Sequence, residues 1–344
     1  MQYHTSTQKE YWTFKCQNEL DMCRFEANDS AIKRIKETIE KDREIQRVNS
    51  VEVEQYSTAL RTYDDNHICE FDKLKPKVEF LTPTEEKVFY EFYELKLRDI
   101  CQLYRKQDKV APPLKIVGTA IAFFKRFFLH NSCMDYPLQD IMYTCIFLAF
   151  KTEERTKDLD TFLQIAHFNG TREKYFKVIL DLEIIVVEQL HFHLQILHPM
   201  GSIDGILADL SFKVGILEIC KALRLLSLRF CEYSLFTNLM FLYSPAQIGA
   251  ACVWLASREF EEKEKIDNYF CDLFKEEKGL FALISNTIAA AIETQSKKSV
   301  DKENARLIYN KLKAFGPFFI DPTSGRYRER YLSVRRFREQ LKST

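Results

Sequence analysis

The sequence predicts an all-α protein, organised as two tandem five-helix modules with helical extensions at both ends. Turn formers are sparse, with 9 Gly and 9 Pro among 344 residues, while long apolar runs repeat at helical spacing. One of these runs recurs later in the chain at a constant offset, as a duplicated unit would. The recurring residues are Ile141/Ile248, Cys145/Cys252, Leu148/Leu255 and Ala149/Ala256.

Composition narrows the class of protein. Apolar residues make up 46% of the chain, enough for two cores, and Lys+Arg and Asp+Glu number 50 each, so the formal net charge is zero. We therefore expect neither direct nucleic-acid binding nor attraction to an acidic membrane. The 10 cysteines form no C-x-x-C pair, which argues against zinc and redox motifs and favours a reducing, intracellular setting. Neither a secretory signal nor a membrane-spanning run is expected.

Residues 1–81 are predicted to form an N-terminal helical extension and a linker. Residues 1–29 mix aromatic and polar side chains, which suggests a tail that packs on some other surface. From Ser30 to Val48, apolar residues recur near helical spacing among dense charges, so a largely solvated helix with one apolar stripe is expected. Residues 49–81 lack a clear period and are assigned as linker.

Residues 82–198 are predicted to form the first module. Thr82 as N-cap, Pro83 at the first helical position and Glu85 three residues after the cap make a capping box, which opens a helix to near Gln107. The other helices are expected over KIVGTAIAFFKRFFLHN, over LQDIMYTCIFLAFKTEE after Pro137, over Thr161 to His167, and over residues 171–194, with His198-Pro199 as the stop.

Residues 199–295 repeat this order and are predicted to form the second module. A helix should begin after Ser202, a second should cover ILEICKALRLLSLRFCEYSLF, and a third should begin at a capping box of Ser244, Pro245 and Gln247. Residues 296–344 are expected to hold a C-terminal helix, Asp301 to Phe315, and an Arg-rich tail that docks on its own domain.

Catalytic and metal-binding motifs are missing from the sequence. It contains no G-x-G-x-x-G, P-loop, G-x-S-x-G or H-E-x-x-H pattern, so neither an enzyme nor a cofactor is predicted. His191, His193 and His198 do not share a helical face, and we expect them to lie at a helix end rather than to bind a metal.

A charge within an apolar run is the main candidate for function. Glu183 lies in ILDLEIIVVEQL, where an unpaired carboxylate would cost several kcal/mol, so it needs a cation. Lys151 is the natural partner because it ends the apolar run IMYTCIFLAF on the predicted central helix. The helical periodicity alone leaves an alternative open, in which Glu183 points outward to solvent from a helix that is apolar on only one side.

Several strings resemble the cyclin family. KIVGTAIAFFKRFFLHNSCMDY followed by IMYTCIFLAFKTEE is similar to the cyclin box in its transcriptional variant. TSTQKEYWTF, LTPTEEKVFYEFYELKL, ILDLEIIVVEQLHFHL and LFTNLMFLYSPAQIGAACVWLASREF resemble the cyclin H group in order and spacing, over residues 1–29 and 78–290. The resemblance implies two tandem cyclin-box domains flanked by N- and C-terminal helices.

The resemblance also implies a non-catalytic subunit that binds and activates a cyclin-dependent kinase through the kinase's N-terminal lobe. The cyclin-box lysine and glutamate that hold the kinase's regulatory helix correspond to Lys151 and Glu183. Other positions implied to face the kinase are Phe150, Thr152, Val187, Phe192 and Leu194.

Further partners implied by the resemblance are a RING-finger assembly factor and TFIIH, in the nucleus. The targets would be other cyclin-dependent kinases and the C-terminal domain of RNA polymerase II. Three features depart from the family pattern: Lys125 precedes Arg126 where cell-cycle cyclins have Asp, FYEFYELKLRDI lacks their substrate-docking residues, and residues 30–66 and the Arg-rich tail have no counterpart.

Two alternative functions share the duplicated fold. One is a cyclin C-like subunit of the Mediator kinase module. The other is a TFIIB-like general transcription factor that binds DNA, which would need a strongly basic face on both modules. Zero net charge, with the Arg cluster confined to the tail, argues against the latter.

Overall fold

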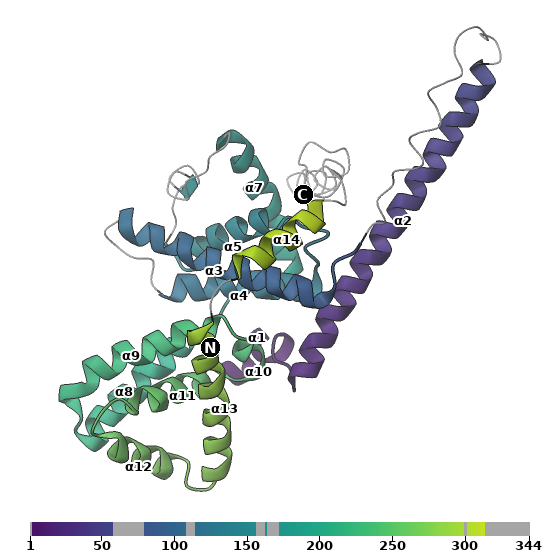
Figure 1. Cartoon of the computed structure of the whole chain (residues 1–344). Coiled ribbons are helices and arrows are strands. Elements are labelled where there is room, and N and C mark those ends of the chain that lie inside the picture. Colours follow the sequence, from purple (N-terminus) through teal and green to yellow (C-terminus); the bar gives the residue numbers. More distant parts are fainter. Residues whose placement is uncertain are drawn as a thin grey trace.

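The computed structural model describes residues 2–57, 79–107, 114–155, 162–163, 172–298 and 301–313. Every regular element within these ranges is helical, which confirms the all-α prediction (Figure 1). The elements are η1 (Tyr3–Thr5), α1 (Thr7–Tyr11), α2 (Gln17–Ser57), α3 (Pro83–Gln107), α4 (Leu114–His130), α5 (Leu138–Thr152), α7 (Arg172–Gln189), α8 (Pro199–Val214), α9 (Leu217–Leu235), α10 (Leu239–Leu242), α11 (Pro245–Ser257), α12 (Lys263–Leu273), α13 (Lys278–Lys297) and α14 (Lys302–Lys313).

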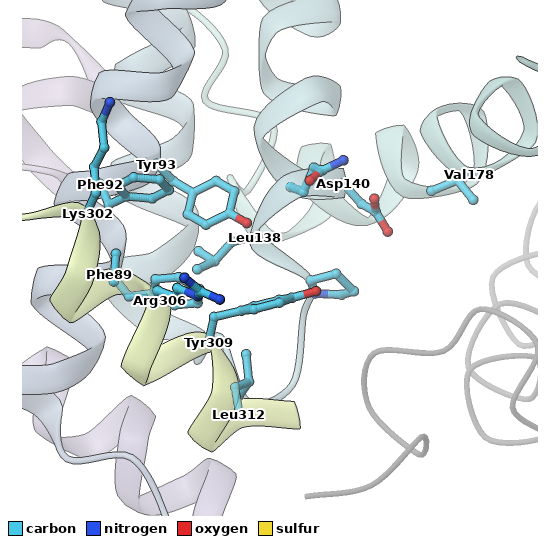
Figure 2. Close-up of a pocket in the computed structure, with 13 residues that line it drawn as sticks. Phe89, Phe92, Tyr93, Leu138, Asp140, Val178, Lys302, Arg306, Tyr309 and Leu312 are labelled. Carbon is cyan, nitrogen blue, oxygen red and sulfur yellow. The ribbon is translucent and has the colours of Figure 1, made fainter. Parts of the chain in front are cut away.

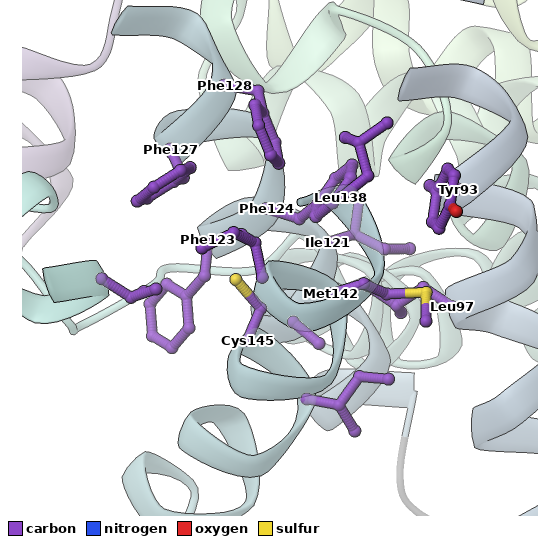
Figure 3. Close-up of a cluster of buried hydrophobic side chains, with 14 of the residues drawn as sticks. Tyr93, Leu97, Ile121, Phe123, Phe124, Phe127, Phe128, Leu138, Met142 and Cys145 are labelled. Carbon is purple, nitrogen blue, oxygen red and sulfur yellow. The ribbon is translucent and has the colours of Figure 1, made fainter. Parts of the chain in front are cut away.

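Helix α5 is the centre of the first module. It packs against α3, α4 and α7, and its residues are buried from Asp140 through Phe150. The aromatic side chains Phe123, Phe124 and Phe127 of α4 are fully buried in the same core (Figure 3). A helix that is apolar on all sides is stable only when it is enclosed, so the two apolar strings have to be neighbours.

Helix α11 has the same position in the second module. It is enclosed by α8, α9, α12 and α13, and its side chains belong to a separate apolar core. The predicted capping box is present, because Ser244 Oγ accepts from Gln247 N at 3.2 Å and Gln247 Oε1 accepts from Ser244 N at 2.9 Å. The recurring residues of the sequence therefore lie on the two central helices, as predicted.

The N-terminal extension differs from the prediction. Helix α2 begins at Gln17 rather than near Ser30, and it continues through Ser57 into the predicted linker. The buried residues Leu20, Ala27, Ala31 and Ile35 form one stripe that starts well before Ser30. The apolar residues Met22 and Phe25 lie on the solvent-exposed face of the helix. They interrupt the apolar period in the sequence, so the buried stripe cannot be recognised from it.

Two helix boundaries near the join of the modules also differ. Helix α8 begins at Pro199, with His198 as its N-cap, rather than after Ser202. Helix α7 ends at Gln189 rather than at 194, because His191 and Phe192 adopt left-handed φ angles of 51° and 60°. Most of the predicted fourth helix, Thr161 to His167, lies outside the described residues, as do residues 58–66 and the Arg-rich tail.

Helix α14 packs against α3 of the first module. Ala305, Ile308 and Leu312 join the first core, and Lys311 Nζ lies 3.0 Å from Glu85 Oε1. Glu85 also completes the predicted capping box, since its Oε2 accepts from Thr82 N at 2.8 Å.

A hollow of about 480 Å³ remains between α14, α3 and the start of α5, lined mainly by aromatic and aliphatic side chains (Figure 2).

A buried ion pair joins the two modules. Lys125 Nζ lies 3.1 Å from Glu94 Oε2 and donates to the Thr237 carbonyl at 2.8 Å. Burial lowers the pKa of Lys125 and raises the pKa of Glu94, while each charge opposes the shift of the other. Lys125 thus contacts α3 of the first module and the α9–α10 turn of the second. The domain boundaries proposed from the sequence stay a prediction.

We expect Glu94→Ala to lower the free energy of unfolding by about 3–5 kcal/mol, because it leaves the Lys125 ammonium buried without a counter-charge. Replacement of both residues by Met should cost much less. Urea denaturation checks this, with Asp272→Ala, at an exposed ion pair, as the matched control. A Glu94→Ala variant as stable as that control would contradict the interpretation.

Candidate functional site

Lys151 and Glu183 meet at one edge of the first module. Lys151 lies in the last turn of α5, Glu183 lies on α7, and Lys151 Nζ donates to Glu183 Oε1. The Lys151 side chain is 43% exposed and that of Glu183 is 14% exposed. Lys151 Nζ also lies 5.4 Å from the centroid of the Phe147 ring, within cation–π range. The predicted pairing is confirmed, and the alternative of an outward, unpaired Glu183 is wrong.

The remaining predicted site residues have different exposures. Phe150 is buried, and its ring centroid lies 6.5 Å from that of Phe162, so it supports the surface from beneath. Thr152, Val187 and Leu194 are half-buried. The ion pair therefore has apolar neighbours that are partly open to solvent, as a protein-binding surface requires.

Phe192 is the most exposed of these residues, at 73%. It follows His191 in the turn after α7, and both residues have positive φ angles, which cost free energy in residues other than glycine. The turn is held by Phe192 N, which donates to the Val187 carbonyl at 3.0 Å, and by His193 N, which donates to the Leu190 carbonyl at 2.9 Å. These hydrogen bonds hold the Phe192 ring in a constrained turn where it is open to solvent.

A groove of about 830 Å³ begins beside this surface. Thr152 and Leu194 line it from the first module, and Met200, Arg224 and Leu228 line it from the second. The groove thus follows the boundary between the modules. Its lining combines apolar side chains with a few charged ones, the usual composition of a site that receives a polypeptide or ligand.

The N-terminal segment covers the segment that links the modules, a contact that our sequence interpretation did not identify. Trp12 Nε1 donates to His193 Nδ1 at 3.1 Å, and the Arg126 guanidinium lies 4.7 Å from the Trp12 ring centroid. Gln8 Oε1 accepts from Leu197 N at 2.8 Å. The aromatic YWTF string was the available signal, but its partners lie far along the chain, where no local pattern points to them.

Arg126 is fully buried under Trp12. Its NH1 donates to the His193 carbonyl at 3.1 Å. Burial lowers the pKa of Arg126 to about 9, so the guanidinium still carries its charge at neutral pH. The stacking of Trp12 on this charge thus adds a cation–π contact to the packing of the N-terminal segment on the first module.

His198 lies at a helix end, as predicted, since it is the N-cap of α8, but its side chain is buried between the modules rather than exposed. Its Nε2 lies 2.8 Å from Thr119 Oγ1, and its ring packs directly on the backbone of Gly118, where an added Cβ atom would lie 2.9 Å from His198 Cε1. His191 and His193 do lie in the turn after α7, as predicted. Within the described ranges, no three side chains are arranged to hold a metal ion.

Glu153 completes the cluster around His198. Burial alone would raise the pKa of Glu153, but the ion pair with Lys115, the hydrogen bond from Thr119 and the nearby His198 ring lower it to about 2. Lys115 Nζ lies 2.5 Å from Glu153 Oε2, and Thr119 Oγ1 donates to Oε1 at 2.6 Å. Glu153 lies two residues after Lys151, so the C-terminal end of α5 also contacts the segment that links the modules.

Comparison with known proteins shows which family has this sequence and this architecture. Residues 105–195 match the family described as Cyclin, N-terminal domain. The chain is 30% identical over 252 residues to Cyclin-H of Xenopus laevis, covering 73% of this chain and 67% of the frog protein. None of the described helices is long and apolar enough to span a membrane.

Two solved structures share the fold. One is the CAK complex of Chaetomium thermophilum bound to ATP-gamma-S, with a TM-score of 0.71 and 22% identity over 99% of this chain and 95% of that chain. The other is the yeast TFIIK (Kin28/Ccl1/Tfb3) complex, with a TM-score of 0.58 and 23% identity over 84% of this chain and 100% of that chain.

The fold and the matching families define a cyclin, that is, a non-catalytic regulatory subunit of a cyclin-dependent kinase. Within the cyclins, the chain belongs to the cyclin-H family.

The Glu153 cluster predicts a stability difference that depends on pH. Because the folded pKa lies below that of a free carboxyl, Glu153 contributes stability above about pH 4.5, and this contribution falls as the pH approaches 2. Glu153→Gln should therefore be less stable than the parent at pH 6, and the difference should shrink between about pH 4.5 and 3. Urea midpoints across this range check it, with the exposed neighbour Glu154→Gln as control; a gap that stays constant with pH would contradict it.

Proposed function

We propose that this chain activates a cyclin-dependent kinase by docking on the kinase's N-terminal lobe through the surface around Lys151 and Glu183. The observation that carries the proposal is the ion pair of a half-exposed Lys151 with a largely buried Glu183 on an apolar surface, at the positions that correspond to the kinase-binding pair of cyclins. Thr152, Val187, Phe192 and Leu194 would contact the kinase, and Phe150 would support them from the core.

The pair is suited to recognise a polypeptide backbone. An ammonium has three N–H donors and Glu183 engages one of them, so Lys151 can also donate to partner carbonyl groups. Carbonyl groups are unsatisfied at the C-terminal end of a helix, where the helix dipole also favours a cation. Glu183 keeps the ammonium in place and neutralises it, so the site does not depend on an acidic partner side chain.

Activation then follows from selective binding. A rigid helical surface that fits only the kinase conformer with its regulatory helix turned inward shifts the kinase toward that conformer. This conformer completes the Lys–Glu ion pair of the kinase itself. A shift from 1:99 to 99:1 requires about 5.5 kcal/mol of selective contact energy, which a few desolvated contacts in an interface of standard size can supply.

We place this activity in a CAK and TFIIH context. The relatives that share the fold are components of a CAK complex and of a TFIIK complex that contains Kin28, Ccl1 and Tfb3. We infer that this chain binds a RING-finger assembly factor besides its kinase, works in the nucleus, and directs the kinase to other cyclin-dependent kinases and to the C-terminal domain of RNA polymerase II.

Reversal of either charge should abolish kinase binding without unfolding the chain. We expect Lys151→Glu and Glu183→Lys each to weaken kinase affinity at least about 100-fold, because each places two like charges together at the surface. Isothermal titration with the purified kinase measures this, and Lys33→Glu, at an exposed ion pair of α2, serves as the matched control. Normal kinase affinity in both variants would overturn the proposal.

Phe192→Ala separates binding from folding. Because the ring is 73% exposed, its removal should leave the thermal unfolding midpoint within about 1 °C of the parent, a shift that corresponds to less than about 1 kcal/mol for a chain of this size. Loss of an exposed aromatic anchor should weaken kinase affinity roughly tenfold or more. The same titration compares it with Leu225→Ala, an exposed apolar residue on the second module. Equal affinities of these two variants would remove Phe192 from the interface.

A further inference from the structure

Three histidines surround the indole ring of Trp12. His130 ends α4, while His191 and His193 lie in the turn after α7, and their ring centroids lie 6.1, 6.3 and 6.3 Å from that of Trp12. Tyr11 also packs on His193, with ring centroids 4.7 Å apart. We call Trp12 and these three residues the Trp12–histidine cluster. Of the 7 histidines in the chain, three thus meet around one side chain, and histidine is the residue that titrates nearest neutral pH.

The hydrogen bond in this cluster requires a neutral imidazole. An indole N–H can only donate, and Trp12 Nε1 lies 3.1 Å from His193 Nδ1, so Nδ1 has to accept. A protonated imidazole carries a hydrogen on both ring nitrogens and has no acceptor. Trp12 is 2% exposed, so water is poorly placed to replace the lost acceptor. Protonation of His193 therefore leaves two donors facing each other.

The charges around His193 also oppose its protonation. The Arg126 guanidinium lies 4.7 Å from the Trp12 ring centroid, and its NH1 donates to the His193 carbonyl. Partial burial lowers the pKa of His193, and His191 and Arg126 lower it further, whereas Glu10 opposes these effects. Protonation of His193 and packing of Trp12 are therefore competing events.

His130 has a smaller part in this competition. Partial burial and the nearby His191 lower the pKa of His130, while Glu26 of α2 raises it. Because His130 ends α4, the helix dipole also favours its protonated form. We therefore assign the main role to His193, whose hydrogen bond to the indole depends directly on its protonation state.

The cluster joins the N-terminal segment, residues 2–15, to the turn that presents Phe192. His193 directly follows Phe192, and both His191 and Phe192 have positive φ angles. Backbone in this region persists only when its surroundings hold it, so loss of the indole contact leaves the turn with fewer constraints. The remaining contacts of the segment include Gln8, whose side chain bonds to the N–H and the carbonyl of Leu197 at 2.8 and 3.3 Å.

We propose that the Trp12–histidine cluster is a pH-sensitive contact, which holds the N-terminal segment on the first module near neutral pH and releases it when His193 takes up a proton. A released segment leaves His193 with an ordinary pKa of about 6.5, above that of the packed state. The released form thus binds more protons, and its population grows as the pH falls below about 6.5. Release also loosens the turn of Phe192, so kinase affinity should fall in acid; this consequence rests on the proposed function.

Acrylamide quenching of Trp12 fluorescence tests the release in the full-length chain. Trp254→Phe removes the second of the 2 tryptophans, so that Trp12 reports alone. Between about pH 7.5 and about pH 5, the quenching constant should rise at least about threefold as the buried indole becomes accessible. His193→Gln should remove most of this rise, because the amide oxygen can still accept from the indole but does not titrate. His4→Gln, at an exposed histidine of the same segment, is the matched control and should keep the rise.

A quenching constant that does not change with pH overturns the proposal, and so does an equal rise in His193→Gln. Far-UV circular dichroism is recorded over the same range of pH. Loss of the helical signal together with the rise in quenching also overturns the proposal, because Trp12 would then become accessible through unfolding of the whole chain.

Titration with the purified kinase at each pH tests the effect on docking. Between about pH 7 and about pH 5.5, the affinity of the parent should fall at least about fivefold more than that of His193→Gln, and comparison of the two variants removes the titration of the kinase itself. Equal pH profiles would overturn the effect on docking. If Lys151→Glu and Phe192→Ala bind the kinase normally while Trp12 still becomes accessible in acid, the proposed function fails and the pH-sensitive contact stands.

Discussion

The enclosure of α5 is the constraint from which the rest of the first module follows. Because this helix is buried from Ile141 through Phe150, it can place ionised groups only in its first turn, where Asp140 lies, and at its C-terminal end. Two such groups lie there, and they serve different contacts. Lys151 pairs with Glu183 at the surface, while Glu153 pairs with Lys115 and contacts the buried His198. A single helix end therefore contributes both to the proposed docking surface and to the joint between the modules.

The joint between the modules is polar and also well packed. Glu94, Lys125 and the Thr237 carbonyl connect α3 and α4 with the second module, and Trp12 covers Arg126 next to the linking segment. Buried charges of this kind are costly unless they are paired, so they favour one arrangement of the modules over others. The groove beside the proposed docking surface depends on that arrangement, since residues of both modules line it.

The two modules share a duplicated scaffold, and local differences in the chain distinguish the surface of the first module from that of the second. The central helices share their buried residues, and each is followed or ended by a cation that packs on an aromatic ring. What differs is the chain after the fifth helix: a turn with positive φ angles presents Phe192 in the first module, whereas α13 continues to Lys297 in the second. The two related modules therefore place the same arrangement of cation, ring and carboxylate in different surroundings.

The sequence alone determined the helical class, the central helices and both capping boxes, because these depend on local periodicity and on hydrogen bonds between residues close together in the chain. It also identified Lys151 as the partner of Glu183, since a carboxylate in an apolar run needs a cation at the end of another apolar run. Only the tertiary structure decided that α2 begins at Gln17, that His198 is buried, that Trp12 covers Arg126 and that Arg258 meets Glu293. These outcomes depend on contacts between residues far apart in the chain, and neither propensity nor period carries information about which distant surface will cover a given side chain.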